Sequence, residues 1–383
     1  MTFKKVTIVI ALFLGVFVVG ADSFIISPLL PEIAHDFHTS ISQTALGVTT
    51  YALCEMIGAP LFGPLGDRFS KRRLLLVGLS IFLLGTFLCA IATSLVPFYI
   101  YRAIAGLGAA LFLPNVWAFI GSYFENKTMN KIMGLVMSAL SLSVALGVPL
   151  GSFLAQLSSW HSAFWASGIL SAIVVLIVFI AIPNTRSQSQ KVTYLANFKA
   201  VFKTKNAPQA LLTDLFWMFA FYILYTFLGS FLTLNFQFNV ATTGTIFLIY
   251  GFANFIAAST GGFIMNHLGR EKSIFINGCA SIVFVLCLGL LGKSFPLMLL
   301  FLICIAFSMG FGVTAISAYL ASLSANHRST LMSFNSSALY LGLTIASALG
   351  GFIFENVGFW LLGVLSALAF AVATFLAHQL TKK

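Results

Sequence analysis

Residues 63–73 read Gly-Pro-Leu-Gly-Asp-Arg-Phe-Ser-Lys-Arg-Arg and carry five charges within the seven residues 67–73. Long apolar runs flank this stretch on both sides. Because a charge at the centre of a bilayer costs about 3 kcal/mol, so dense a cluster indicates a tight turn at a membrane surface. Gly63 and Gly66 permit such a turn and the close approach of two helices. A weaker copy at residues 262–272 has Asn266 where the first has Asp67, close to half the chain further on. The sequence therefore predicts two related halves.

The composition is typical of an integral membrane protein. The chain has 383 residues, of which 60% are hydrophobic and 8% charged, and its mean hydropathy is +1.02. A soluble domain carries about 25% charged residues. Too few polar side chains exist here to cover the surface of a soluble core, so the sequence predicts a polytopic helical membrane protein.

The positive charges gather on one side of the predicted membrane. Of the 20 Lys and Arg residues, only Arg102 and Lys293 fall outside the segments assigned to the cytoplasm. This is the positive-inside pattern, so the net charge of +11 indicates a membrane surface and not a nucleic acid. We expect a multi-pass protein of the plasma (inner) membrane, monomeric, with both termini in the cytoplasm.

Hydropathy predicts an all-α integral membrane fold of twelve transmembrane helices, from residues 6–30 to residues 358–380, in two pseudo-symmetric six-helix bundles. We expect an N-terminal bundle at 1–183, a cytoplasmic linker with an amphipathic helix at 184–206, and a C-terminal bundle at 207–383. Such symmetry suits alternating access, in which one half rocks against the other.

Four stretches resemble sequence motifs of the major facilitator superfamily. Residues 63–73 resemble its motif A, residues 101–110 its motif B, and residues 147–151 its motif C, the antiporter signature. Asp22 and the residues up to Ile33 are similar to the first helix of the bacterial 12-helix drug and sugar efflux branch, the drug:H⁺ antiporter-1 group. The resemblance implies a transporter fold, proton-coupled export, and a latch at Gly63, Asp67 and Arg68 that stabilises one conformation. In motif C, Ser143 replaces the first glycine and Val148 splits the Gly-Pro pair.

Asp22 and Arg102 are charges expected at similar depth in the membrane. Either of them unpaired would be costly, so we expect a pair or a shared cavity. The pair is either a structural ion pair or a proton-coupling site in which Asp22 loads a proton and Arg102 tunes its binding.

Two further acids lie inside predicted spans. Glu55, deep in span 2, is a candidate second proton site or a contact for a cationic substrate, and otherwise a hydrogen-bonded structural acid. Asp214, near the start of span 7, is a candidate substrate contact, and otherwise an acid that favours a helix N-terminus.

Gly147, Pro149 and Gly151 place a helix-breaking residue between two small ones inside span 5. Proline removes a backbone hydrogen bond and kinks a helix, and glycines allow tight packing. Structure alone would explain this pattern, and a gating role rests on the resemblance to motif C.

Aromatic and amide side chains repeat along predicted helix faces, as a cavity for apolar or cationic solutes requires. With 41 Phe residues in the chain, such stripes also arise from lipid-facing surfaces. The candidate substrate contacts are Asn115, Trp117, Asp214, Trp217, Phe221, Tyr225, Tyr250, Asn254, Asn335 and Tyr340.

We expect proton-coupled export of a small amphipathic solute, such as a drug, a sugar or a nucleoside. No phosphate-binding loop, metal-ligand spacing or catalytic triad is present in the sequence. We therefore expect no enzymatic activity, no catalytic or metal site and no cofactor, with the proton gradient as the energy source. The expected partners are the solute, protons and the lipid bilayer. Alternatives are a uniporter, an uptake symporter, or a membrane sensor or scaffold built on a transporter fold.

Overall fold

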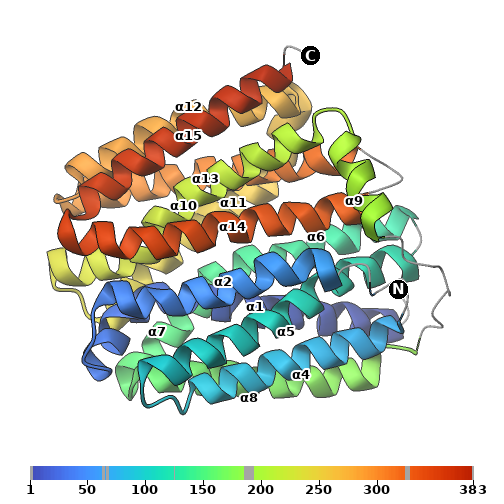
Figure 1. Cartoon of the computed structure of the whole chain (residues 1–383), viewed down its shortest axis with the longest axis horizontal. Coiled ribbons are helices and arrows are strands. Elements are labelled where there is room, and N and C mark those ends of the chain that lie inside the picture. Colours follow the sequence, from blue (N-terminus) through green and yellow to red (C-terminus); the bar gives the residue numbers. More distant parts are fainter. Residues whose placement is uncertain are drawn as a thin grey trace.

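The computed structural model describes residues 3–62, 65, 69–124, 126–184, 194–323 and 328–381, and within these ranges it contains helices and no strands (Figure 1). In a bilayer, where water is absent, a chain can satisfy its backbone polar groups within α-helices or closed β-barrels, and these long apolar runs form helices. The helices are α1 (Phe3–Asp36), α2 (Ile41–Phe62), α4 (Lys71–Cys89), α5 (Leu95–Tyr123), α6 (Asn126–Leu142), the π-helical turn η1 (Ser143–Gly147), α7 (Val148–Leu157), α8 (Trp160–Ala181), α9 (Tyr194–Lys203), α10 (Ala207–Phe236), α11 (Val240–Leu268), α12 (Arg270–Leu291), α13 (Phe295–Leu323), α14 (Arg328–Asn356) and α15 (Phe359–Thr381).

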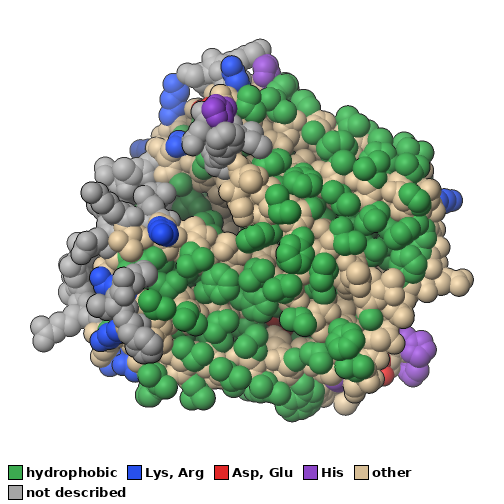
Figure 2. Space-filling model, turned by 180° about the vertical axis from the view of Figure 1, so that it is seen from behind, with side chains coloured by type: hydrophobic (Ala, Val, Ile, Leu, Met, Phe, Trp, Pro, Cys, Tyr) green, Lys and Arg blue, Asp and Glu red, His purple; other side chains and the backbone are tan. Residues whose placement is uncertain are grey.

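Twelve segments of the described chain are long and apolar enough to cross a membrane, with α6, η1 and α7 together forming one of them. The predicted all-α membrane fold is therefore confirmed. Large apolar side chains cover the visible surface (Figure 2), and Ile180, for example, is 81% exposed. Such side chains face lipid. The start of α1 and the end of α15 lie at the same end of the molecule (Figure 1), as an even number of spans requires.

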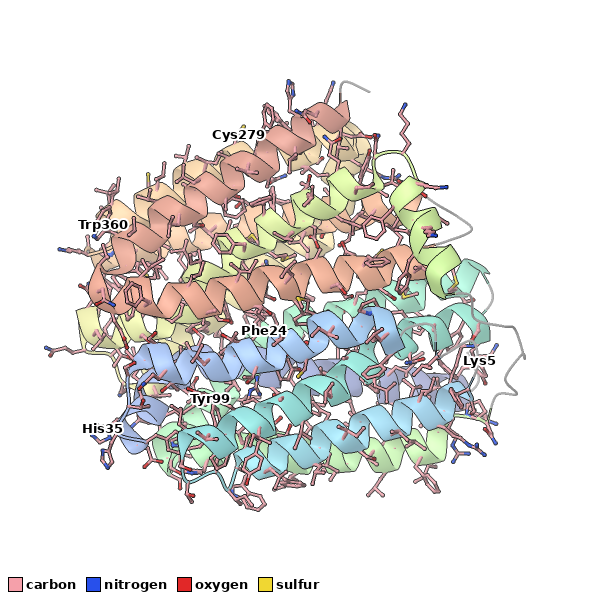
Figure 3. All side chains as sticks on the ribbon, viewed as in Figure 1. Lys5, Phe24, His35, Tyr99, Cys279 and Trp360 are labelled. Carbon is pink, nitrogen blue, oxygen red and sulfur yellow. The ribbon has the colours of Figure 1, made fainter. Side chains whose placement is uncertain are left out.

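The helix α1 is longer than hydropathy predicts. Glu32, His35 and Asp36 come after the first predicted span at residues 6–30, yet they lie on the last turns of α1. Its 34 residues span about 51 Å at 1.5 Å per residue, which exceeds a hydrocarbon core of about 30 Å. Figure 3 shows Lys5 and His35 at opposite ends of the molecule, with Phe24 between them.

Polar contacts join α2 to α14 along their length, and the two helices lie side by side in Figure 1. At the end of the pair that is expected to face outward, the backbone N–H of Ser42 donates to Glu355 Oε1 at 2.8 Å. Deeper in, the hydroxyls of Thr49 and Ser347 lie 2.8 Å apart. Deeper again, Ser337 donates to the carbonyl of Met56 at 2.9 Å. We call these three contacts the α2–α14 seam.

A second line of contact joins η1 and α7 to α11. The backbone widens to a π-helical turn just before Pro149, and the N–H of Val148 bonds to the carbonyl of Ser143, five residues back. Where the sequence predicts a kink around Pro149, the structure contains a π-turn, and both proline and π-turns are recognised causes of helix kinks. Gly244 and Gly251 of α11 pack against this region; a Cβ on Gly244 would lie 2.6 Å from that of Ser152.

The linker contains α9, whose aromatic side chains contact α14. The ring centroids of Phe198 and Phe202 lie 4.9 and 5.1 Å from that of Phe334. The division of the chain into residues 1–183, 184–206 and 207–383 stays a prediction.

Candidate functional site

Asp22 of α1 and Arg102 of α5 form an ion pair in the membrane interior. Arg102 Nη1 lies 2.5 Å from Asp22 Oδ2, and both side chains are 0% exposed. Thr86 of α4 donates to the other carboxylate oxygen at 3.5 Å. Burial of two opposite charges is tolerated when they are paired and hydrogen-bonded. The sequence placed both residues at similar depth, and the structure brings them together.

The guanidinium of Arg102 also stacks on an aromatic ring. Its Cζ lies 4.2 Å from the centroid of Tyr51 on α2, a cation–π geometry. The hydroxyl of Ser23 donates to that of Tyr51 at 2.9 Å, which fixes the ring. Arg102 Nε and Nη2 have no partner among the described residues. The arginine therefore keeps donors for another acceptor when the bond to Asp22 breaks.

Glu55 lies one turn after Tyr51 on the same face of α2 and is 1% exposed. Its carboxyl forms a side-chain hydrogen bond with Tyr340 of α14. Within the described chain, Oε2 of Glu55 has no partner. Glu55 lies within electrostatic range of both Asp22 and Arg102. It therefore connects the charged pair to the other half of the molecule.

Asp214 is buried on α10, with 1% of its surface exposed. It lies two turns into the helix, and the first turn of α10 contains no acid. The interpretation of Asp214 as an acid at a helix N-terminus is therefore wrong, because the dipole acts within the first turn. Tyr222 lies within electrostatic range of both Glu55 and Asp214.

Aromatic side chains of α1, α10 and α11 meet next to these acids. The centroid of Phe24 lies 5.5 Å from that of Tyr225 and 6.3 Å from that of Tyr222. Phe221 lies 5.0 Å from Tyr225 and 6.1 Å from Tyr250. Three of these residues, Phe221, Tyr225 and Tyr250, also line a narrow apolar crevice with residues of α12, α13 and α15. We call the five residues the aromatic cluster.

The other predicted contacts lie apart from this cluster or already have structural partners. Asn115 donates to the carbonyl of Leu111 at 2.7 Å on its own helix. Asn254 donates to the carbonyl of Ala306 at 3.2 Å. Trp217 is 0% exposed and packs on Phe370 of α15 at 5.1 Å. Two residues complete the set: Trp117 packs against the core of the N-terminal helices, and Asn335 is buried on α14 with an unpartnered Oδ1.

The predicted gating residues divide into two groups. Gly63, Asp67 and Arg68 lie outside the described residues. Gly147 and Gly151 pack against α1; a Cβ on Gly147 would lie 2.6 Å from that of Ala21, and one on Gly151 would overlap Ile25. Pro149 follows the π-turn and lies against Gly244 of α11. These three residues therefore occupy the contact between α1, α7 and α11.

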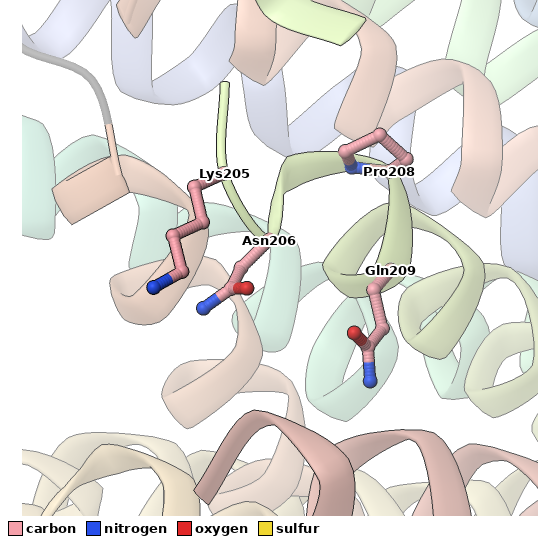
Figure 4. Close-up of a pocket in the computed structure, with 4 residues that line it drawn as sticks. All are labelled: Lys205, Asn206, Pro208 and Gln209. Atoms are coloured by element: carbon pink, nitrogen blue, oxygen red, sulfur yellow. The ribbon is translucent and has the colours of Figure 1, made fainter. Parts of the chain in front are cut away.

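An open cavity of about 530 Å³ lies at the inner end of α10 (Figure 4), lined by Lys205, Asn206, Pro208 and Gln209. None of the predicted site residues lines it. Figure 2 shows the surface hollowed towards the end of the molecule where most of the visible Lys and Arg side chains gather. In the described ranges no three His, Cys, Asp or Glu residues come together as a metal site would require.

Twelve spanning helices in this arrangement agree with the family that the motifs resemble. The sequence profile described as Major Facilitator Superfamily matches residues 12–324 and, in a second alignment, residues 218–382. The chain belongs to the Major Facilitator Superfamily. The resemblance read from residues 63–73, 101–110 and 147–151 is thereby confirmed at the level of the superfamily.

Relatives within the superfamily match the chain over nearly its full length. YwfA of Bacillus subtilis, described as an uncharacterized MFS-type transporter, is 32% identical over 375 residues, 96% of this chain and 91% of the relative. Multidrug resistance protein 1 of Bacillus subtilis is 24% identical over 385 residues, 96% of each. The crystal structure of the human organic anion transporter MFSD10 (TETRAN) covers 98% of this chain and 100% of its own, with a TM-score of 0.76 and 16% identity, which shows the shared fold.

The sequence prediction missed two phenols of this facilitator site. Tyr51 stacks on Arg102, and Tyr222 lies within electrostatic range of both Glu55 and Asp214. Tyr51 precedes Glu55 by four residues, a spacing that places both on one helix face, so it could have been found. The approach of Tyr222 to Glu55 and Phe24 carries no such signal, because those two residues come from a distant part of the chain.

Proposed function

We propose that this facilitator exports a small amphipathic solute by alternating access, coupled to proton entry. The observation that supports the proposal is the Asp22–Arg102 pair, which is fully buried in the membrane interior. Replacing both charges by apolar residues would remove the desolvation cost, so a purely structural pair is an expensive solution. A carboxylate whose partner can be released is what proton coupling requires.

The proposed cycle starts from the paired state. A proton from the outside binds the Asp22 carboxylate and neutralises it, which removes its attraction for the Arg102 guanidinium. Arg102 keeps its contact with Tyr51 and offers Nε and Nη2 to another acceptor. Release of the proton to the inside restores the pair. Solute moves outward on the opposite leg of the cycle, as the bundles rock between two orientations.

Other residues have proposed supporting roles. Glu55 is a second protonation site or a contact for a cationic solute. Gly63, Asp67 and Arg68 form the cytoplasmic latch, and Gly147, Pro149 and Gly151 provide the flexible contact with α1 and α11. The solute contacts are Asn115, Trp117, Asp214, Trp217, Phe221, Tyr225, Tyr250, Asn254, Asn335 and Tyr340, of which Phe221, Tyr225 and Tyr250 belong to the aromatic cluster.

The proposed direction of transport and the proposed membrane location are supported by different observations. Multidrug resistance protein 1 is a relative over 96% of the chain, which supports export of drug-like solutes. The distribution of Lys and Arg supports a plasma membrane location with both termini in the cytoplasm. The energy source is the proton gradient, and neither a cofactor nor catalysis is part of the proposal.

The proposal is tested with purified protein in proteoliposomes under an imposed pH step. The wild type should move solutes from a panel of drugs, sugars and nucleosides against their gradients, and dissipating the pH step should stop accumulation. The variant Asp22→Asn should lose gradient-driven transport while remaining folded. Unchanged proton-driven flux in this variant would remove Asp22 from the mechanism.

The alternatives predict different results in the same vesicles. A uniporter equilibrates solute without responding to the pH step, and an uptake symporter accumulates solute in the direction of proton flow. A sensor or scaffold shows neither net flux nor counterflow with any solute in the panel.

A further inference from the structure

Three acids lie in the membrane interior, and they differ in what surrounds them. Asp22 has Arg102, and Glu55 has Tyr340. Asp214 is equally buried, yet neither of its carboxylate oxygens has a partner within the described residues. Asp214 is therefore the acid whose charge the fold does not compensate.

Among the described residues, no cation on the helices packed against α10 forms an ion pair with Asp214. Its own helix places Tyr222 within electrostatic range. The titratable groups that neighbouring helices turn towards α10 are phenols, Tyr250 of α11, Tyr319 of α13 and Tyr340 of α14. On other helices that pack against α10, Asp22 of α1 pairs with Arg102, His378 of α15 packs on Phe275, and Lys199 and Lys203 of α9 are exposed.

A carboxylate in such surroundings is far more costly than a neutral carboxylic acid. Asp214 therefore holds a proton in this conformation. If the Asp214 carboxyl kept this proton permanently, an amide or an apolar side chain could replace it without loss to the helix. A group that releases it when the bundles rearrange carries a proton across the membrane.

We propose that Asp214 is a second proton-carrying carboxyl of the transport cycle, placed in the C-terminal helices, in addition to Asp22. This rests on the proposed function. The step is a simple acid dissociation: the O–H bond of the Asp214 carboxyl breaks, the proton passes to water on the inner side, and a proton from the outer side later restores the bond.

The structure contains a donor suited to the ionised form. Trp217 lies three residues after Asp214, on the neighbouring position of the helix face, and its Nε1 has no acceptor among the described residues. A rotation of the carboxylate towards this N–H would give the ionised form a hydrogen bond that it lacks here. The indole thus stabilises the deprotonated state after the site opens.

Tyr222 connects this site to the N-terminal helices. It lies within range of Asp214 and of Glu55, and Glu55 bonds Tyr340. A change of charge at Asp214 therefore alters the field at Tyr222, a phenol that also lies within range of Glu55 in the N-terminal half.

The test measures the number of protons moved per solute in proteoliposomes. This number follows from the solute gradient at which net solute flux stops under an imposed pH gradient. Asp214→Asn should move one proton fewer per solute than the wild type, and Asp214→Glu should move as many as the wild type. Thr213→Ala is the matched control, because the Thr213 hydroxyl bonds its own backbone at the Gln209 carbonyl. An unchanged proton count in folded Asp214→Asn overturns the proposal. A wild type without proton-driven flux would instead refute the proposed function.

A spectroscopic measurement keeps the proposal testable if Asp214→Asn does not fold. The chain contains four aspartates, Asp22, Asp36, Asp67 and Asp214. Protein made by cell-free synthesis with isotope-labelled aspartate, and carrying Asp22→Asn, Asp36→Asn and Asp67→Asn, has Asp214 as its single labelled carboxyl. Near neutral pH its infrared spectrum should contain a label-shifted band of a protonated carboxyl. Absence of that band overturns the proposal.

Discussion

At the scale of single residues, the molecule concentrates its buried charge in a few places. Asp22 and Arg102 pair within one half, while Glu55 reaches Tyr340 in the other half. The equal depth of Asp22 and Arg102 could be read from helix rise alone, so that pair was predictable. The contact of Glu55 with Tyr340 could not be predicted, because 285 residues separate the two and their contact depends on how the halves dock.

The Asp22–Arg102 pair makes a testable prediction about stability. Arg102→Met leaves a buried carboxylate without its partner and should lower the free energy of unfolding by about 3–5 kcal/mol. The double variant Asp22→Asn with Arg102→Met removes both charges and should regain a large part of this loss. Thermal unfolding in detergent measures the wild type, the single variants Asp22→Asn and Arg102→Met, and the double variant.

Strict additivity of the two single changes would contradict an energetic coupling between these side chains. Thr86→Val provides a matched comparison, because it removes only the 3.5 Å hydrogen bond to Asp22 and keeps the size of the side chain.

At the scale of the helices, two lines of contact hold the halves together. The α2–α14 seam is polar, and the contact of α11 with η1 and α7 relies on small residues. The spans themselves were predictable because the bilayer requires long apolar runs. The π-turn was not predictable, because the sequence pattern around Pro149 is equally compatible with a simple kink. The glycines that pack around it, Gly244 and Gly251, belong to the other half.

The outer end of the α2–α14 seam should control which side of the molecule opens. Glu355 accepts the N–H of Ser42 at the positive end of the α2 dipole, and it lies on the opposite half. Glu355→Ala should therefore shift the population towards the outward-open state. Distances between spin labels at the outer ends of α2 and α14 would report the change as a longer component.

Asn356→Ala is the matched control, because Asn356 is also exposed and bonds only its own helix, at the carbonyl of Phe352. A distance distribution that is the same in Glu355→Ala as in this control would exclude a role for the carboxylate in closing the outer side.

At the scale of the whole molecule, alternating access requires the outer seam to separate in every cycle. Thr49 and Ser347 face each other with their hydroxyls 2.8 Å apart, so cysteines at both positions are close enough to form a disulfide. Oxidised protein carrying Thr49→Cys and Ser347→Cys should stop transporting, and reduction should restore transport. Flux in proteoliposomes before and after reductant measures this.

The single variants Thr49→Cys and Ser347→Cys, treated with the same oxidant, control for effects on the native cysteines such as Cys54. Transport at the wild-type rate by the fully crosslinked protein would contradict the rocking of the two halves.

The long first helix has a mechanical consequence. Its overhang beyond the bilayer is tied to α8, because Trp160 Nε1 donates to Asp36 Oδ2 at 3.0 Å. Phe37 adds an aromatic contact with Trp160, with ring centroids 5.4 Å apart. These contacts hold the end of α1 and the start of α8 rigidly together. Any tilt of one half against the other must therefore be taken up at the contacts between the two halves.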